Sequence, residues 1–413
     1  MEQEKNQVIA SRAFINKGDD KILFINSEAQ KRKSNGEKVI NASIGSLFDE
    51  DGSLTDLTIV NDELKKNLND KGRSYPTTNG GNDFKNGILK WLFLDNYDRL
   101  SQNFSSSVIA TPGGTGAISL ALRNYTEENQ KVLIPSIGWS NYEALVVQSG
   151  ARVDYYELFE NNHFNLNSFK EKVIENIEEN QRLFVIINDP CQNPTGYVLK
   201  ENELKEIISF LNYISKDHPV VLLMDIAYFD FCSSNRSRLF FNLLSDLNNN
   251  FLCLIAFSAS KTFSIYGLRL GALIAISSSN DVISSFNSSS VSTARAIWSC
   301  PNAHAINTVS SILNDETKKQ LLLNELNEKR KMLENRGRLF TDEANEIGLK
   351  TFPYVSGFFI TIPASNAQDV FEKLSQEGIY VLPMKGKYIR VALSGLRINE
   401  VKGLASKIKQ YIK

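Results

Sequence analysis

Up to about residue 305, short apolar runs alternate with longer amphipathic segments. Continuous apolar runs such as 183–187 and 220–224 are typical of strands that are covered on both faces of a sheet. Between these two runs, residues 201–211 have helical spacing. Strand, helix and strand in succession predict a mostly parallel sheet wrapped by helices. Further strands are predicted at 108–110, 131–135, 251–257 and 271–276, and a further helix at 117–122.

Beyond about residue 305 the pattern changes. Residues 306–346 are rich in Leu, Glu, Lys and Asn with helical periodicity, which predicts one or two long helices. Strands are predicted at 357–362 and 388–393, with a helix at 367–377 between them. These elements indicate a smaller α+β domain.

This change in the apolar pattern divides the chain into three parts. We expect an N-terminal segment, 1–54, that joins the small domain, because the large sheet begins later. The large domain should span 55–305, and residues 306–413 should form a long connecting helix and the small C-terminal domain. Patches rich in Asn and Ser, at 248–250 and 277–290, are interpreted as loops and helix ends.

Composition excludes several classes of protein. A length of 413 residues suits two domains, and 42% hydrophobic and 23% charged residues are ordinary for a soluble globular protein. A formal net charge of −1 gives no electrostatic case for nucleic acid or an anionic membrane. No apolar run approaches the ~20 residues of a membrane span, and the N-terminus lacks a secretory apolar core. Four scattered cysteines and three distant histidines predict free thiols, no metal site and a cytoplasmic protein.

Lys261 lies among small hydroxyl residues at the end of the predicted strand 251–257. Ser258 precedes it, and Arg269 stands just before the next predicted strand. A lysine in such a place can form a Schiff base with an aldehyde cofactor, while hydroxyls and an arginine can hold a phosphate. The alternative is a solvated loop lysine.

A second segment, 111–117, joins a predicted strand to a predicted helix and contains Gly113, Gly114 and Thr115. Glycines let the backbone approach a phosphate, and a helix N-terminus offers free N–H groups and a positive dipole end. The segment matches neither GxGxxG nor GxxxxGK[ST], so dinucleotide or nucleoside triphosphate binding has little support. A tight turn that serves only packing is the alternative.

Other polar residues also follow predicted strands. Asp225 comes directly after 220–224, where a carboxylate can hold a cationic ring nitrogen or cap a helix, and Tyr228 is about one helical turn further on. Asn193 begins an Asn-Pro-Thr-Gly turn after 183–187. Ligands bind beyond strand C-termini in open α/β sheets. Several such motifs from separate strands favour a single site.

The segment around Lys261 resembles the lysine signature of pyridoxal-phosphate aminotransferases of class I, in the aspartate and aromatic amino-acid group. The resemblance runs from Asn41 to Gly395, with the motifs in the family order. It implies fold type I, an α/β fold whose mostly parallel central sheet is flanked by helices, with a smaller α+β domain. It also implies pyridoxal 5'-phosphate as the cofactor.

The resemblance gives each of these residues a role. Lys261 would hold the cofactor and move a proton, Asp225 would pair with the pyridine nitrogen, and Tyr228 would reach the ring hydroxyl. Asn193 would lie by that hydroxyl and by the substrate carboxylate. The residues expected around the cofactor phosphate are Gly113, Gly114, Thr115, Ser258 and Arg269.

Trp139, in segment 135–142, would stack on the ring; a packing tryptophan is the alternative. The family usually has proline, a small residue and then tryptophan here, so this chain carries a two-residue insertion. Tyr142 stands where close relatives have a histidine that supports the aspartate. Both departures bear on how the ring and Asp225 are held.

Substrate recognition is expected from four further residues. Arg390, inside a predicted strand, matches the clamp for the α-carboxylate, which suits a planar guanidinium; it could instead pair with a buried acid. Gly45 resembles a glycine whose backbone closes over the substrate, or serves as a plain turn. Arg295 and Tyr75 match residues that reach the neighbouring subunit's site, the first for a dicarboxylate side chain and the second for the cofactor phosphate. These two imply a homodimer, whereas a surface arginine and a packing tyrosine are the alternatives.

The resemblance therefore implies transfer of the amino group of an L-amino acid to 2-oxoglutarate by a ping-pong mechanism. Aspartate is the first expected donor and aromatic amino acids are next, since Arg295 does not exclude them. A β-lyase or decarboxylase of the same fold shares Lys261 and Asp225. A catalytically silent cofactor-binding regulator is a third reading, but such proteins usually add a DNA-binding module, for which the N-terminus is too short and insufficiently basic.

Overall fold

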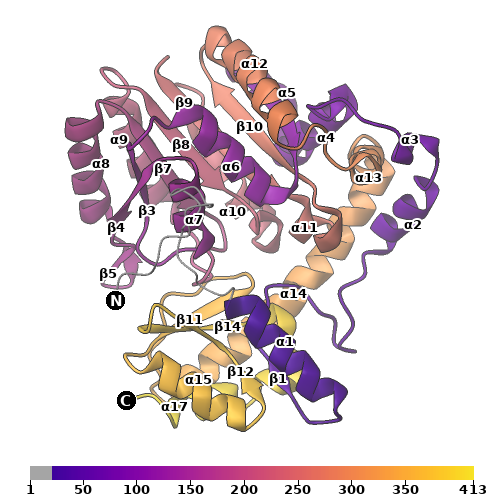
Figure 1. Ribbon diagram of the computed structural model, residues 1–413, viewed down its shortest axis with the longest axis vertical. Helices are drawn as coiled ribbons and strands as arrows, with labels where there is room; N and C mark the ends of the chain where they lie inside the picture. The colour runs from indigo at the N-terminus through magenta and orange to yellow at the C-terminus, as the bar shows by residue number, and fades with distance from the viewer. Residues whose placement is uncertain (1–20) are drawn as a thin grey trace, which may run out of the picture.

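A seven-stranded sheet lies at the centre of the large lobe in the computed structural model, which describes residues 21–413 (Figure 1). The strand order is β2-β10-β9-β8-β7-β3-β4. β10 runs antiparallel to both of its neighbours, and the other pairs are parallel. The strands are β2 (Ser105–Thr111), β3 (Lys131–Pro135), β4 (Arg152–Tyr156), β7 (Leu183–Asn188), β8 (Val220–Asp225), β9 (Phe251–Ser258) and β10 (Gly271–Ser277).

Helices cover both faces of this sheet, so its central strands are buried along their whole length. In β8, Leu222 and Met224 belong to the core on one face, while Val221 and Leu223 belong to the core on the other. A strand with two apolar faces therefore loses the alternation of a half-exposed strand and becomes a continuous apolar run. The helices are α6 (Gly113–Tyr125), α7 (Asn141–Gln148) and α12 (Asn280–Ile297) on one face, and α4 (Gly81–Phe93), α8 (Leu166–Asn180), α9 (Glu201–Ile214) and α13 (Ala303–Leu313) on the other.

The carboxyl ends of the parallel strands meet at one edge of the sheet. Asn188 of β7 lies in register with Asp225 of β8. Gly271 begins the antiparallel β10 and pairs with both Thr111 and Ser258, the last residues of β2 and β9. The turn that precedes β10 therefore reaches the same edge as the segments that follow the other strands.

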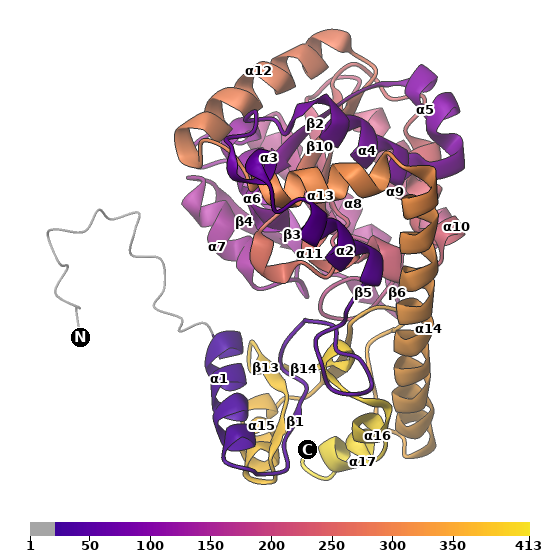
Figure 2. The same cartoon turned by 90° about the vertical axis from the view of Figure 1, so that its right-hand side faces the viewer.

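The small lobe is built from both ends of the described chain (Figures 1 and 2). Its three-stranded antiparallel sheet has the order β11-β14-β13, and β1 pairs in parallel with β12. Its elements are α1 (Lys21–Ser34), β1 (Ile40–Asn41), β11 (Phe359–Pro363), α15 (Ala367–Gln376), β12 (Ile379–Tyr380), β13 (Leu382–Met384), β14 (Tyr388–Ala392), α16 (Ile398–Val401) and α17 (Leu404–Lys409).

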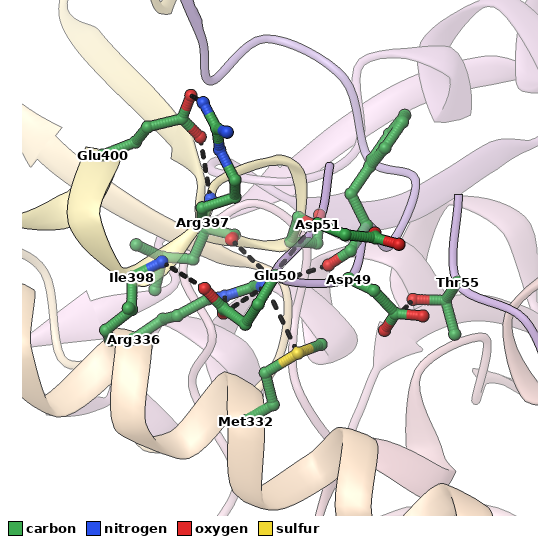
Figure 3. Close-up of polar contacts among 12 residues, drawn as sticks. Asp49, Glu50, Asp51, Thr55, Met332, Arg336, Arg397, Ile398 and Glu400 are labelled. Carbon is green, nitrogen blue, oxygen red and sulfur yellow. Dashed lines mark hydrogen bonds and ion pairs between the residues drawn. The ribbon is translucent and has the colours of Figure 1, made fainter. Parts of the chain in front are cut away.

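One long helix, α14 (Glu316–Glu346), runs from the large lobe into the small one (Figure 2). Leu326 packs in the core of the large lobe, whereas Phe340 packs in the core of the small lobe. Between them Arg336 is wholly buried and donates to the Glu50 carboxylate at 2.7 Å and to the Phe48 carbonyl at 2.9 Å (Figure 3). Arg336 of α14 thus holds the loop that follows β1 in place.

The predicted strands and helices are confirmed within one to a few residues at their ends, and the segment 306–346 contains α13 and α14 as two helices. The interpretation of 277–290 as loops and helix ends is wrong, because α12 begins at Asn280 and ends at Ile297. Hydroxyls of Ser288 and Ser289 bond back to carbonyls one turn earlier, which satisfies them within a helix. Residues 248–250 form a loop as predicted, and the domain boundaries at 54 and 305 stay predictions. None of the helices within residues 21–413 combines the length and the apolar character that a membrane span requires.

Candidate active site

A cavity of about 190 Å³ opens at the edge where the strands end. Its lining comes from the segments after β2, β3, β7, β8 and β9 and from the turn before β10. The residues singled out in the sequence that line it are Gly114, Thr115, Trp139, Asn193, Asp225, Tyr228, Ser258, Lys261 and Arg269. Motifs from five separate connections of the sheet thus meet in one place.

Lys261 lies in the single-turn helix α11 (Ala259–Thr262), directly after β9. Its Nζ donates to the Gly45 carbonyl oxygen at 3.1 Å and lies over the ring of Tyr266, 4.6 Å from its centroid. Burial, together with the positive charges of Arg269 and Arg390, lowers the pKa of this amine to about 7. A substantial fraction of Lys261 is therefore neutral and nucleophilic near neutral pH.

The first turn of α6 forms an anion cradle with Arg269. Gly113 has φ +77°, and a Cβ there would lie 2.6 Å from Nη2 of Arg269. A Cβ at Gly114 would lie 3.2 Å from the Cβ of Ser258. Arg269 is held by its Nη1, which donates to the Tyr266 carbonyl at 2.9 Å. Side chains at these glycines would fill the space in front of free helical N–H groups, so the cradle fits a phosphate.

Asp225 ends β8 and presents a buried carboxylate to the cavity. Its Oδ2 accepts from the Tyr142 hydroxyl at 2.5 Å, and its Oδ1 accepts from the Ala227 N–H at 3.0 Å. Burial raises the pKa of Asp225, while these donors and the nearby Lys261 act in the opposite direction. Trp139 contacts Tyr142 edge to face at 5.4 Å, so it remains in the cavity wall despite the insertion before it.

Arg390 enters from the small lobe on β14 and is 3% exposed. Its Nη2 donates to the Ser43 carbonyl at 2.7 Å and its Nη1 to Oδ1 of Asn193 at 3.3 Å, while its Nε has no partner among the described residues. The guanidinium lies 4.4 Å from the centroid of the Phe359 ring. Burial lowers its pKa to about 10, which leaves it charged at neutral pH. No carboxylate within residues 21–413 forms a salt bridge with it, so the alternative of a buried structural acid is wrong.

Gly45 lies at the boundary between the lobes. A Cβ at this position would come within 2.7 Å of Cζ of Phe359, the ring beneath Arg390. The requirement for glycine here is therefore close packing, with no need for a left-handed backbone. Its carbonyl oxygen points at Lys261.

Two of the predicted site residues lie away from the cavity of their own chain. Tyr75 is 93% exposed. Arg295 is exposed near the end of α12, where its Nη1 donates to the Ser299 hydroxyl at 2.6 Å. Neither contacts Lys261 or Asp225.

The cavity also contains residues that the sequence motifs did not single out. Asn188 donates its side-chain N–H to the Asp225 carbonyl at 2.8 Å and accepts from the Asn193 N–H at 2.7 Å. Tyr266 accepts from the Leu47 N–H at 2.9 Å and places its ring under Lys261. A polar residue at the end of an apolar strand could have indicated Asn188. The remaining lining residues are Ile118, Ala227 and Ser260.

The fold and this cavity together define an enzyme of fold type I that binds pyridoxal phosphate and acts on amines. Residues 37–408 match the class I and II aminotransferases, and the chain belongs to that family as a pyridoxal-phosphate-dependent aminotransferase. The resemblance drawn from the sequence motifs is thereby confirmed.

Named relatives fall into two groups. The aromatic-amino-acid aminotransferase of Escherichia coli (strain K12) is 27% identical over 396 residues, which cover 94% of this chain and 96% of that protein. The aspartate aminotransferase of Haemophilus influenzae is 27% identical over 334 residues, which cover 80% of this chain and 82% of that protein. Both enzymes are about equally similar to this chain, so similarity alone does not choose the donor.

Solved structures share the fold over nearly the whole chain. An aminotransferase from Anaerococcus prevotii is 33% identical with a TM-score of 0.92, covering 98% of this chain and 99% of that one. An aromatic-amino-acid aminotransferase from Burkholderia pseudomallei, described as covalently bound to pyridoxal phosphate, has a TM-score of 0.77 at 24% identity. Coverage in that comparison is 97% of this chain and 99% of that one.

Proposed function

We propose that this enzyme transfers the amino group of an L-amino acid to 2-oxoglutarate in two alternating half-reactions, with aspartate as the first donor and aromatic amino acids next. The observation that carries the proposal is Arg390, a buried cation that within residues 21–413 has a free Nε and no acid partner. It donates to Asn193, which lines the same cavity as Lys261. Such a cation is stabilised by a ligand carboxylate, which every amino-acid and keto-acid substrate supplies.

Pyridoxal phosphate, when bound, supplies an aldehyde that captures amines and a ring that withdraws electrons from the amino-acid Cα. Asp225 would face the ring nitrogen, while Tyr228 and Asn193 would face the ring hydroxyl and Trp139 the ring itself. The residues proposed for the phosphate are Gly113, Gly114, Thr115, Ser258 and Arg269. The glycine cradle described above supports this placement.

Lys261 would act as the general base that removes the Cα proton and returns it to the cofactor side. A pKa of about 7 suits this work, because an amine poised near neutral pH both accepts and donates a proton. Arg390 would hold the α-carboxylate through its planar fork and so orient the bond to be broken. Gly45 would fix the amine of Lys261 through its carbonyl oxygen.

We also propose that the enzyme is a homodimer in which Tyr75 and Arg295 complete the partner's site. Both are exposed and lie outside their own cavity, as residues that act across an interface would. Arg295 would then receive a dicarboxylate side chain. We place the enzyme in the cytoplasm, since Cys191, Cys232, Cys253 and Cys300 are all free thiols.

The visible absorbance of cofactor-loaded enzyme tests the function. Added aspartate without any keto acid should change the absorbance once and stoichiometrically, and 2-oxoglutarate should restore it. Conversion by phenylalanine as well would identify a broad-range enzyme. Release of pyruvate without an acceptor would instead identify a β-lyase, and Lys261→Ala retaining about a tenth of the activity would remove the lysine from its role.

A further inference from the structure

Tyr142 lies behind the cavity, and its hydroxyl reaches into the wall formed by Asp225. The 2.5 Å contact joins a wholly buried phenol to a carboxylate that is 6% exposed. A hydrogen bond between a hydroxyl and an ionised carboxylate is charge-assisted and short. The Ala227 N–H donates to the other oxygen, so each oxygen of the Asp225 carboxylate accepts one hydrogen bond from the protein. Each oxygen keeps a further lone pair that can accept a hydrogen bond from a group in the cavity.

The phenol is itself firmly placed. Tyr142 is the second residue of α7, and its backbone N–H donates to the Trp139 carbonyl at 3.0 Å. The two rings meet edge to face at 5.4 Å. Trp139 thus lines the cavity while Tyr142 lies beneath it, so one short turn supplies both the wall and the support of Asp225.

Tyr142 acts as a donor only. Burial raises its pKa well above the ordinary value, and the adjacent Asp225 raises it further. The other titratable groups facing the pair are Lys261 of α11, Tyr228 after β8 and Tyr156 of β4. Lys261 favours an ionised Asp225 by charge, whereas Tyr142 favours it through a hydrogen bond and adds no charge. A phenol also stays neutral and able to donate between pH 5 and 8, the range in which an imidazole would titrate.

We propose that Tyr142 is a positioning residue that keeps the Asp225 carboxylate ionised and aimed into the cavity, so that a proton shared with a bound ring nitrogen stays on the nitrogen. The inference rests on the role proposed above for Asp225. Removing the donor makes the carboxylate a stronger competitor for that proton. The shared proton would then lie closer to the carboxylate, and the ring nitrogen would hold less of it.

The ¹⁵N chemical shift of the ring nitrogen at neutral pH measures this directly, with holoenzyme that carries cofactor labelled with ¹⁵N in the ring. Tyr142→Phe should move this chemical shift toward the value of an unprotonated ring. It should also reduce kcat about tenfold or more, because losing one hydrogen bond to a charged group changes an equilibrium by roughly a power of ten. KM should change little. Tyr156→Phe is the matched control, since this tyrosine is equally buried and donates to the Ile186 carbonyl at 3.4 Å.

A ¹⁵N chemical shift in Tyr142→Phe equal to that of the wild type and of Tyr156→Phe would overturn the inference. Asp225→Asn separates this failure from failure of the proposed function, because an unchanged chemical shift there would remove Asp225 from the ring nitrogen altogether. If Tyr142→Phe does not fold, 3,5-difluorotyrosine at position 142 keeps the shape and strengthens the donor. The chemical shift should then move toward the value of a protonated ring, and no movement would overturn the inference equally.

Discussion

The amine of Lys261 and the carbonyl oxygen of Gly45 lie 3.1 Å apart, which joins the segment after β9 in the large lobe to the loop that leaves β1 in the small lobe. The same loop is held on its other side by Arg336 of α14. The position of the lysine therefore depends on contacts from both lobes.

Capture of the cofactor by the apoenzyme should follow the ionisation of Lys261. Because the pKa is lowered to about 7, the neutral amine predominates above pH 7 and declines below it. The capture rate should therefore fall about tenfold per pH unit below pH 7 and level off above it, since only the neutral amine attacks an aldehyde. Stopped-flow absorbance measures the rate, and a midpoint near the ordinary lysine value of 10.5 would contradict the prediction.

Arg390→Ala should reduce kcat/KM about 30-fold or more for every amino donor, because a charge-assisted pair with the α-carboxylate is worth roughly 2–5 kcal/mol. Arg390→Lys should recover only part of the loss, since an ammonium lacks the planar fork. Steady-state kinetics with aspartate and phenylalanine provide the measurement. Arg397→Lys serves as the control, because Arg397 pairs with Glu400 at the surface of the small lobe. A loss confined to one donor would assign Arg390 to the side chain of the substrate.

Arg295→Ala should selectively reduce activity with dicarboxylic substrates, about 30-fold or more for aspartate, and leave phenylalanine within a few fold. Mixing it with Lys261→Ala subunits tests whether Arg295 acts across the interface. A hybrid dimer would contain one site with both defects and one intact site, so aspartate activity should reappear on mixing. Equal losses for aspartate and phenylalanine would remove Arg295 from substrate selection.

Glu50→Gln should destabilise the folded enzyme by about 1–3 kcal/mol, because it weakens the only carboxylate contact of the wholly buried Arg336 within the described residues. This expected loss of stability is smaller than for a fully buried ion pair, since the Glu50 side chain is 44% exposed. Asp49→Asn weakens the neighbouring pair with Lys329 and should cost under about 1 kcal/mol. Urea unfolding measures the free energy of unfolding of both variants. Equal losses would contradict the prediction that the buried Arg336 depends on Glu50.

Most of the site could be predicted because its groups follow apolar strands in the sequence. Asp225 and Ser258 are the last residues of their strands, so the parallel sheet alone brings them to one edge. Arg269 reaches the same edge because β10 is reversed, which the apolar pattern does not reveal. A pattern of apolar residues shows that a strand is buried but carries no information on its direction.

Contacts between distant segments could not be predicted in the same way. The hydrogen bond from Tyr142 to Asp225 depends on how α7 leans on the sheet, and the insertion before it obscured its register. In α12, the buried residues Ile283, Phe286 and Ala294 follow helical spacing, but the intervening serines concealed it. Serine is a poor helix former only while its hydroxyl competes for backbone groups.

The reversal of β10 also shapes how the site is assembled as the chain folds. Ser258, Lys261 and Arg269 come from one short connection, closed when Gly271 pairs with Ser258. Short loops close at little entropic cost, so this pairing belongs to the most local contacts of the fold. Gly45 meets Lys261, and Arg390 meets Ser43, only after segments from near the two ends of the chain have come together. A chain that has lost its small lobe would keep the residues proposed for the phosphate and lose Arg390, the cation proposed for the α-carboxylate.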